Sequence, residues 1–203
     1  MRKNDKWNKR NIYIPKQESL RTNVEKRIPN LRTDIAKYKV SEIFEIINGK
    51  GITDEEISEI ADGDIPCIQG GEQNNGILGY FSKKQIGDKK YKYIDEPSLT
   101  LSRVGSAGAI NFHKKCFIGD KAKSLILKEN YASHKSTYVY LYLSVILRAN
   151  QFRYTYGRGI VNEIYQNIIL ELPTKNHQPD WEFMEEYIKS LSNSDLINTY
   201  HNL

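Results

Sequence analysis

One short polar stretch of the sequence holds side chains that are suited to recognise the edges of nucleic-acid bases. The amides of Gln and Asn can pair with adenine, and a Glu carboxylate can accept a hydrogen bond from cytosine. Glycines and amides also make ordinary solvated turns, so base recognition and a plain turn are both open interpretations of this stretch. The residues concerned are Gln69, Glu72, Gln73, Asn74 and Asn75.

Two arginines stand beside glycines, where a partner molecule can approach the backbone closely. Arg103 precedes Gly105 by two positions, and Arg158 lies between Gly157 and Gly159. An arginine in such a place can bind guanine through two hydrogen bonds or clamp a phosphate. We include both arginines among the candidate base-reading residues, with a tight turn and a solvent-facing arginine as the alternative.

The region around these residues is strongly basic. Residues 80–160 carry 15 Lys or Arg and 5 Asp or Glu, a net charge of +10, whereas the whole chain of 203 residues has a net charge of +5. Lys and Arg neutralise phosphates, and hydroxyl groups can donate to phosphate oxygens. A solvated basic face is the alternative. The candidate phosphate-contacting residues are Lys83, Lys84, Ser102, Ser106, Lys121, Lys123, Arg153, Tyr154 and Tyr156.

The sequence contains no complete catalytic or metal-binding motif. The run from Gly105 to Gly108 lacks the third glycine and the lysine of a phosphate-binding loop, and Ser106 does not have the spacing of a nucleophile elbow. Pro179-Asp180 could begin a nuclease metal motif, but no Asp/Glu-x-Lys follows it. The two cysteines, which we expect to be reduced and half-buried, and the scattered histidines do not make a zinc site. We predict no catalytic residue and no metal ligand, with a DNA-acting hydrolase of diverged site as the alternative.

Hydrophobic spacing predicts the elements that would position these groups. Val40, Ile43, Phe44 and Ile47 have the spacing of an amphipathic helix, which would end at Asn48-Gly49. Thr53 is followed by three acidic residues and predicts the N-cap of a short helix that extends to about residue 60. Short apolar segments separated by turn residues predict strands at 65–69, 77–81, 92–94, 98–104, 109–113, 116–118 and 124–127.

Two further helices complete the prediction. Residues 138–148 are apolar on nearly all sides, so this helix should cross the back of the strands. Residues 176–203 should form a C-terminal amphipathic helix that docks on the domain or on a partner, with Trp181, Met184, Ile188 and Leu191 on one stripe. The predicted fold class is α/β, of the α+β type, with a compact mixed sheet or partial barrel flanked by helices.

The first 37 residues are predicted to be a basic N-terminal extension or linker. Residues 1–40 carry 12 Lys or Arg and 4 Asp or Glu, with few large apolar side chains. No stretch approaches the roughly 18 apolar residues that a membrane span requires, and the first residues lack the apolar core of a signal peptide. We expect a cytoplasmic protein that does not bind membranes.

The order of the motifs between residues 38 and 197 resembles the target-recognition domain of restriction-modification specificity subunits, of the single-domain type. The segments that carry the resemblance are Ile43-Phe44-Glu45-Ile46, Gly49-Lys50-Gly51, Ile65-Pro66-Cys67-Ile68, Asn74-Asn75-Gly76-Ile77, the run from Thr100 to Gly108, the run from Arg153 to Gly159, the run from Ile168 to Pro173 and the run from Pro179 to Leu191.

This resemblance implies an α/β domain at residues 38–175 that reads one part of a short double-stranded DNA sequence. It also implies a partner methyltransferase or endonuclease subunit that cleaves or methylates the DNA and binds AdoMet and Mg²⁺, while this chain binds no cofactor itself. A homodimer stays open, because the chain has room for one recognition domain. A protein-interaction module that does not bind DNA is the remaining alternative.

Overall fold

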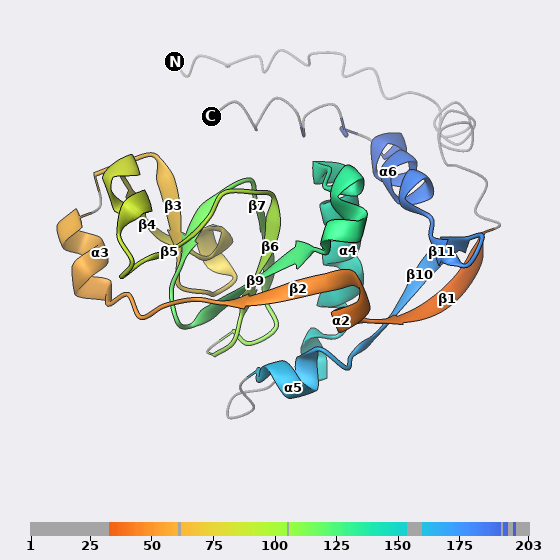
Figure 1. Ribbon diagram of the computed structural model, residues 1–203, viewed down its shortest axis with the longest axis horizontal. Helices are drawn as coiled ribbons and strands as arrows, with labels where there is room; N and C mark the ends of the chain where they lie inside the picture. Colours follow the sequence, from red (N-terminus) through yellow and green to blue (C-terminus); the bar gives the residue numbers. More distant parts are fainter. Residues whose placement is uncertain are drawn as a thin grey trace, which may run out of the picture.

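The strands of the domain form three small sheets, with helices against their outer faces (Figure 1). The computed structural model describes residues 33–60, 62–104, 106–153, 160–191, 193–194 and 197, without the side chains of Asp54, Ile60 and Arg153. The strand orders are β1-β10-β11, β2-β9-β6-β7 and β4-β3-β8-β5. The strands are β1 Asp34–Lys39, β2 Phe44–Asn48, β3 Ile65–Ile68, β4 Ile77–Phe81, β5 Lys92–Ile94, β6 Ser98–Ser102, β7 Ile110–His113, β8 Cys116–Ile118, β9 Ala122–Leu127, β10 Ile169–Lys175 and β11 Gln178–Pro179.

The described part of the chain has two longer α-helices, both in its C-terminal half, and several short ones. They are α2 Val40–Ile43, α3 Asp54–Ile60, α4 Thr137–Arg148, α5 Asn162–Tyr165 and α6 Trp181–Ser190. Single 3-10 turns lie at Gln73–Gly76, Lys83–Gly87, Glu129–His134 and Gln151–Arg153. No helix in the described part of the chain is both long and apolar enough to cross a membrane.

The central sheet β2-β9-β6-β7 is buried on both faces. In β9, Leu125 and Leu127 point toward α4, whereas Ala122 and Ile126 point toward the sheet that contains β3 and β8. Side chains of a strand alternate between the two faces, so a strand covered on both sides needs apolar residues at nearly every position. All six residues of β9 are buried, which fits this requirement.

Helix α4 covers one face of the central sheet, and α6 packs against α4 and β10 (Figure 1). Val139, Leu143 and Met184 are fully buried there. Each helix begins at a side-chain cap, because Ser136 Oγ accepts from the backbone N–H of Val139 at 3.2 Å and the Asp180 carboxylate accepts from that of Phe183 at 3.0 Å. The predicted helix across the back of the strands is present as α4. The C-terminal helix predicted for residues 176–203 is present as α6, but it begins only at Trp181, because Gln178 and Pro179 form β11 against β10.

A second, smaller core lies between α3 and the sheet β4-β3-β8-β5. Ile57, Ile65, Phe81 and Phe117 are buried there together with Cys67. The predicted cap of α3 is present: the Glu56 backbone N–H donates to Thr53 Oγ1 at 3.1 Å, and the Thr53 N–H donates to the Glu56 carboxylate at 2.9 Å. Both cysteines are free and fully buried rather than half-buried.

Strand β1 pairs with β10 and joins the two ends of the described chain. The strands are antiparallel, with Asp34 opposite Thr174 and Lys39 opposite Ile169. Residues 34–37 therefore belong to a strand of the domain, although we predicted that they lie in the N-terminal extension. The rest of that extension lies outside the described residues.

The predicted fold class is confirmed, whereas one predicted helix is wrong. The described residues form a mixed α/β domain in which helices flank three separate sheets, and no barrel closes among these strands. The helix predicted for residues 40–47 stops after one turn at Ile43, and Phe44 begins β2, which pairs with β9 through Phe44 and Leu127. Asn48 ends this strand rather than a helix.

Candidate nucleic-acid interface

Three segments that are far apart in the sequence meet around the polar loop that follows β3, residues 69–76. An added Cβ atom on Gly70 would lie 2.8 Å from Ser102 Oγ and 3.1 Å from the Lys121 carbonyl oxygen, so the loop contacts both the end of β6 and the turn between β8 and β9. The Gln151 amide donates to the Glu72 carboxylate, which brings the 3-10 turn after α4 to the same place. The topology thus gathers several candidate residues at one end of the sheets.

The polar loop has a backbone that few sequences can adopt. Gly70, Gly71 and Gly76 have φ values of 105°, 113° and 75°, and Asn74 and Asn75 have φ values of 48° and 52°. Glycine adopts positive φ without a Cβ clash, and Asn tolerates it better than most other residues. The Gly and Asn residues of this stretch are therefore explained in part by the backbone that they permit.

Two side chains of β7 hold this loop in place. Asn111 Nδ2 donates to the Gly71 carbonyl at 3.1 Å, and His113 Nε2 donates to the Asn75 carbonyl at 3.1 Å. Burial lowers the pKa of His113 to about 4, although its hydrogen bond to Asn75 opposes the shift, so the ring is neutral near pH 7. The sequence analysis missed both residues; the available signal was polar residues at alternate positions of a predicted strand.

Glu72, Asn74 and Asn75 present their side chains to solvent on the loop. Asn74 Nδ2 donates to the Ile77 carbonyl at 3.1 Å, which orients its amide. Gln69 differs from these residues, because it is only 4% exposed and its amide donates to the Ile52 carbonyl. In this structure the Gln69 side chain supports the loop from inside the domain.

Arg103 lies half-buried beside the turn between β8 and β9. Its Nη1 donates to the Asp120 carbonyl and its backbone N–H to the Lys121 carbonyl, both at 2.9 Å. Its own carbonyl accepts from the backbone N–H of Ile160 at 3.0 Å. The guanidinium is thus fixed next to the polar loop, with Ser106 and Lys121 exposed nearby on the two turns.

Two other candidates at this end are buried. Ser102 is 2% exposed and donates to the Val104 carbonyl at 3.0 Å, and Lys123 is 4% exposed and donates to Asn48 Oδ1 at 2.6 Å. Burial and the positive charge of Arg103 lower the pKa of Lys123. Both side chains are engaged inside the domain.

The remaining candidates fall into two groups. Lys83 and Lys84 are exposed on the 3-10 turn after β4, and the polar loop lies at the opposite end of that strand. Five residues of strand span roughly 16 Å, so these lysines would reach a different part of a long ligand. The Arg153 side chain, Tyr154, Tyr156 and Arg158 lie outside the described residues.

The described residues hold no cluster of metal-ligand type. No three His, Cys, Asp or Glu side chains in that part of the chain are grouped so that they could hold a metal ion. Burial raises the pKa of Cys67 and of Cys116 to about 12, so both thiols are protonated near pH 7.

The structure is thus a mixed α/β domain with a polar, loop-built end. Residues 33–199 match the family described as the Type I restriction modification DNA specificity domain. Since the match covers most of the chain, the chain belongs to this family. The resemblance inferred from the order of motifs is confirmed, and at the level of the family the chain is a specificity domain rather than a catalytic subunit.

Similar proteins agree with this assignment. The chain is 30% identical over 201 residues to the Type II restriction enzyme BgcI specificity subunit S.BcgI of Heyndrickxia coagulans, a match that covers 92% of this chain and 54% of the relative. Its fold is similar to that of the S subunit of a type I restriction-modification system from M. genitalium, with a TM-score of 0.60 and 14% identity over 92% of this chain and 45% of that chain. A structure of a type I R-M system that concerns complex assembly and conformational transition contains another similar chain, with a TM-score of 0.53 and 18% identity over 91% of this chain and 48% of that one. The chain spans about half the length of these relatives.

Proposed function

We propose that this chain reads part of a short double-stranded DNA sequence for a restriction-modification system. One observation carries the proposal. In this chain, which belongs to a specificity-domain family, the loop with Glu72, Asn74 and Asn75 lies at the same end of the sheets as Arg103 and Lys121. Carboxylate, amide and guanidinium groups can each recognise base edges, and lysine can neutralise a phosphate.

Within this surface, exposure divides the candidates by role. Glu72, Asn74, Asn75 and Arg103 are the proposed base-reading residues, because their polar groups lie at the surface or beside it. Ser106 and Lys121 are proposed to contact phosphates. Gln69, Ser102 and Lys123 are buried, and we propose that they support the surface rather than contact DNA.

We further propose that a partner methyltransferase or endonuclease subunit acts on the DNA that this chain selects. AdoMet and Mg²⁺ would then be bound by that partner, and the complex would work in the cytoplasm. The homodimer that the sequence left open is a separate proposal; the mass of the particles with and without DNA, measured by light scattering, distinguishes one copy from two.

The decisive experiment selects bound fragments from a pool of random DNA duplexes and then measures affinity for the selected sequence at two salt concentrations. We expect enrichment of one short motif and an affinity for random duplex that falls steeply with salt, because each neutralised phosphate releases counterions. Binding without any enriched motif would remove the base-reading proposal. No binding to any duplex, together with retained binding to a methyltransferase subunit, would favour a protein-interaction module.

A further inference from the structure

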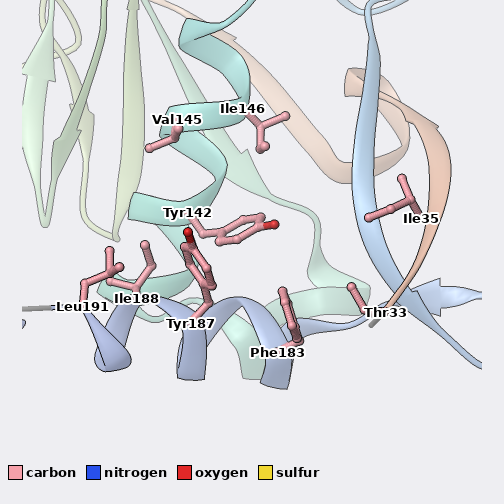
Figure 2. Close-up of a pocket in the computed structure, with 9 residues that line it drawn as sticks. All are labelled: Thr33, Ile35, Tyr142, Val145, Ile146, Phe183, Tyr187, Ile188 and Leu191. Atoms are coloured by element: carbon pink, nitrogen blue, oxygen red, sulfur yellow. The ribbon is translucent and has the colours of Figure 1, made fainter. Parts of the chain in front are cut away.

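An apolar groove runs between α4, α6 and β1. Its volume is about 460 Å³, and Figure 2 shows aromatic and aliphatic side chains from all three elements around it. Ile35 of β1, Val145 of α4 and Leu191 after α6 are 58%, 62% and 42% exposed. Contiguous exposed apolar surface of this kind marks a place where another segment or molecule binds.

The surface continues along α4 and becomes more polar. A second hollow of about 550 Å³ shares Ile146 with the groove and extends to Phe152 and Ile169, which are 75% and 45% exposed. Lys37, Asn150 and Glu171 also line this hollow. An occupant therefore meets an elongated surface along a helix of 12 residues, about 18 Å in length. A chain segment fits this shape better than a compact small molecule.

We propose that residues 17–32 of the same chain cover this groove. The chain that precedes β1 is already at the site, because Thr33 is one of the residues that line the groove. Sixteen residues of chain are long enough to follow a surface of about 18 Å even as a helix, which rises about 1.5 Å per residue. The proposal does not depend on DNA binding.

The sequence of this segment matches an apolar surface. Leu20, Val24 and Ile28 are spaced four residues apart, which places them on one side of a helix. The residues between them are largely charged or polar, and Pro29 follows Ile28 directly, where a helix would end. A segment with a single apolar side needs a complementary surface in order to bury it.

Outside its apolar side, the segment before β1 is basic. Residues 1–32 carry ten Lys or Arg and three Asp or Glu. The glutamates of α6, Glu182, Glu185 and Glu186, are not among the residues that line the groove, and each pairs with Lys175 or Lys189. The basic residues of the segment can therefore stay in solvent while its apolar side covers the groove.

Disulfide trapping in the full chain tests this proposal. Val145→Cys is combined with Val24→Cys, and the matched control combines Val145→Cys with Lys26→Cys. In a helix formed by this segment, Lys26 would lie on the side opposite to Val24. The native cysteines do not compete, because both are fully buried. We expect an intramolecular disulfide to form several-fold faster in the first pair, since a disulfide requires Cα atoms within about 7 Å.

Equal rates for the two pairs would overturn the proposal, and a disulfide that joins two chains would show that a second copy occupies the groove instead. A second measurement does not require a disulfide. Val24→Asp should expose the groove and increase binding of the apolar dye ANS, whereas Thr22→Asp should not. Equal dye binding by these two variants would also contradict the proposal.

Discussion

Arg103 joins the end of β6 to the turn between β8 and β9. Its guanidinium donates to the Asp120 carbonyl, and its Nε is buried without a hydrogen-bond partner in the described part of the chain. A side chain that is already held in one orientation loses less conformational entropy when it binds a ligand. This makes Arg103 the residue at which specific recognition is best tested.

Replacement of Arg103 by Ala should weaken binding to the selected sequence and flatten the preference at one base position. The expected loss of discrimination is about 1–3 kcal/mol, the typical contribution of an arginine with two hydrogen bonds to guanine. Competition against single-base variants of the selected duplex measures it.

Lys83→Ala is the matched control for this substitution. It removes a predicted phosphate contact, so the affinity for the selected duplex and for random duplexes should fall by similar factors. The affinity should also depend less steeply on salt concentration. If Arg103→Ala also weakens all sequences uniformly, Arg103 is a phosphate clamp and the base-reading role falls to the polar loop.

His113 makes the stability of the domain depend on pH. Its pKa falls from 6.5 to about 4 on folding, mainly through burial. The unfolded chain therefore binds a proton below pH 6.5 that the folded chain excludes until about pH 4. The neutral His113 therefore contributes its full stabilisation above pH 6.5. On acidification from pH 6.5 to about pH 4, the free energy of unfolding should fall by about 1.4 kcal/mol per pH unit.

Thermal melts of the native chain and of His113→Gln between pH 7 and pH 4.5 test this prediction. The Gln amide can still donate to the Asn75 carbonyl but does not titrate. The native chain should lose more stability than the variant as the pH falls. Parallel pH profiles for the two proteins would show that His113 is not the source of the dependence.

At the scale of elements, the turn between β8 and β9 packs directly under the polar loop. A Cβ atom on Gly119 would collide with the Gln69 amide, which itself donates to the Ile52 carbonyl. Gly119→Ala should therefore lower the free energy of unfolding by about 1–3 kcal/mol, as overpacking of a filled site does.

A double-mutant cycle separates this collision from other effects. In a Gln69→Ala background the cost of Gly119→Ala should become smaller, because the obstructing amide is gone. Gly51→Ala is the control, since an added Cβ there meets nothing within 4 Å. An unchanged cost in the double variant would contradict the proposed contact.

Elements whose signals are local were predictable from the sequence, whereas elements decided by strand pairing were not. Thr53 and Glu56 form their capping box within four residues, so the start of α3 could be read directly. The spacing of Val40, Ile43 and Phe44 suited a helix equally well, but β9 offers a partner for Phe44 that only the folded chain provides. Tertiary pairing outweighed helical periodicity there.

The same limit applies to the candidate interface. Its residue types were predictable because amides, glycines and basic side chains follow one another along the chain. Their exposure was not predictable: Gln69 and Lys123 look as polar as Glu72 and Lys121 in the sequence, yet the neighbouring turns bury the first two. The anchoring by Asn111 and His113 depends on strand β7 passing beside the loop.

At the scale of the whole molecule, α6 belongs to the main core rather than to an appendage. Trp181 and Ile188 are 7% exposed and Met184 is fully buried against the cluster that includes α4 and the central sheet. Removal of residues 179–203 should therefore abolish cooperative thermal unfolding or lower its midpoint strongly, because several large side chains would lose their cover.

Removal of residues 1–30 is the comparison for this truncation. It leaves β1 intact and should preserve a cooperative transition. Scanning calorimetry of the two truncated chains measures both effects. Equal loss of stability in the two would place the boundary of the domain before residue 30.

The places where the chain enters and leaves the folded domain determine how it can be built into larger proteins. The chain enters β1 at Thr33 and leaves α6 at Leu191, and both residues line the groove between α4, α6 and β1. A domain whose two chain ends lie near each other can be inserted into another polypeptide without moving apart the host residues on either side of it. Such a unit can be copied in tandem or exchanged between hosts as a cassette, and the recipient then acquires a new binding preference while its own framework stays unchanged.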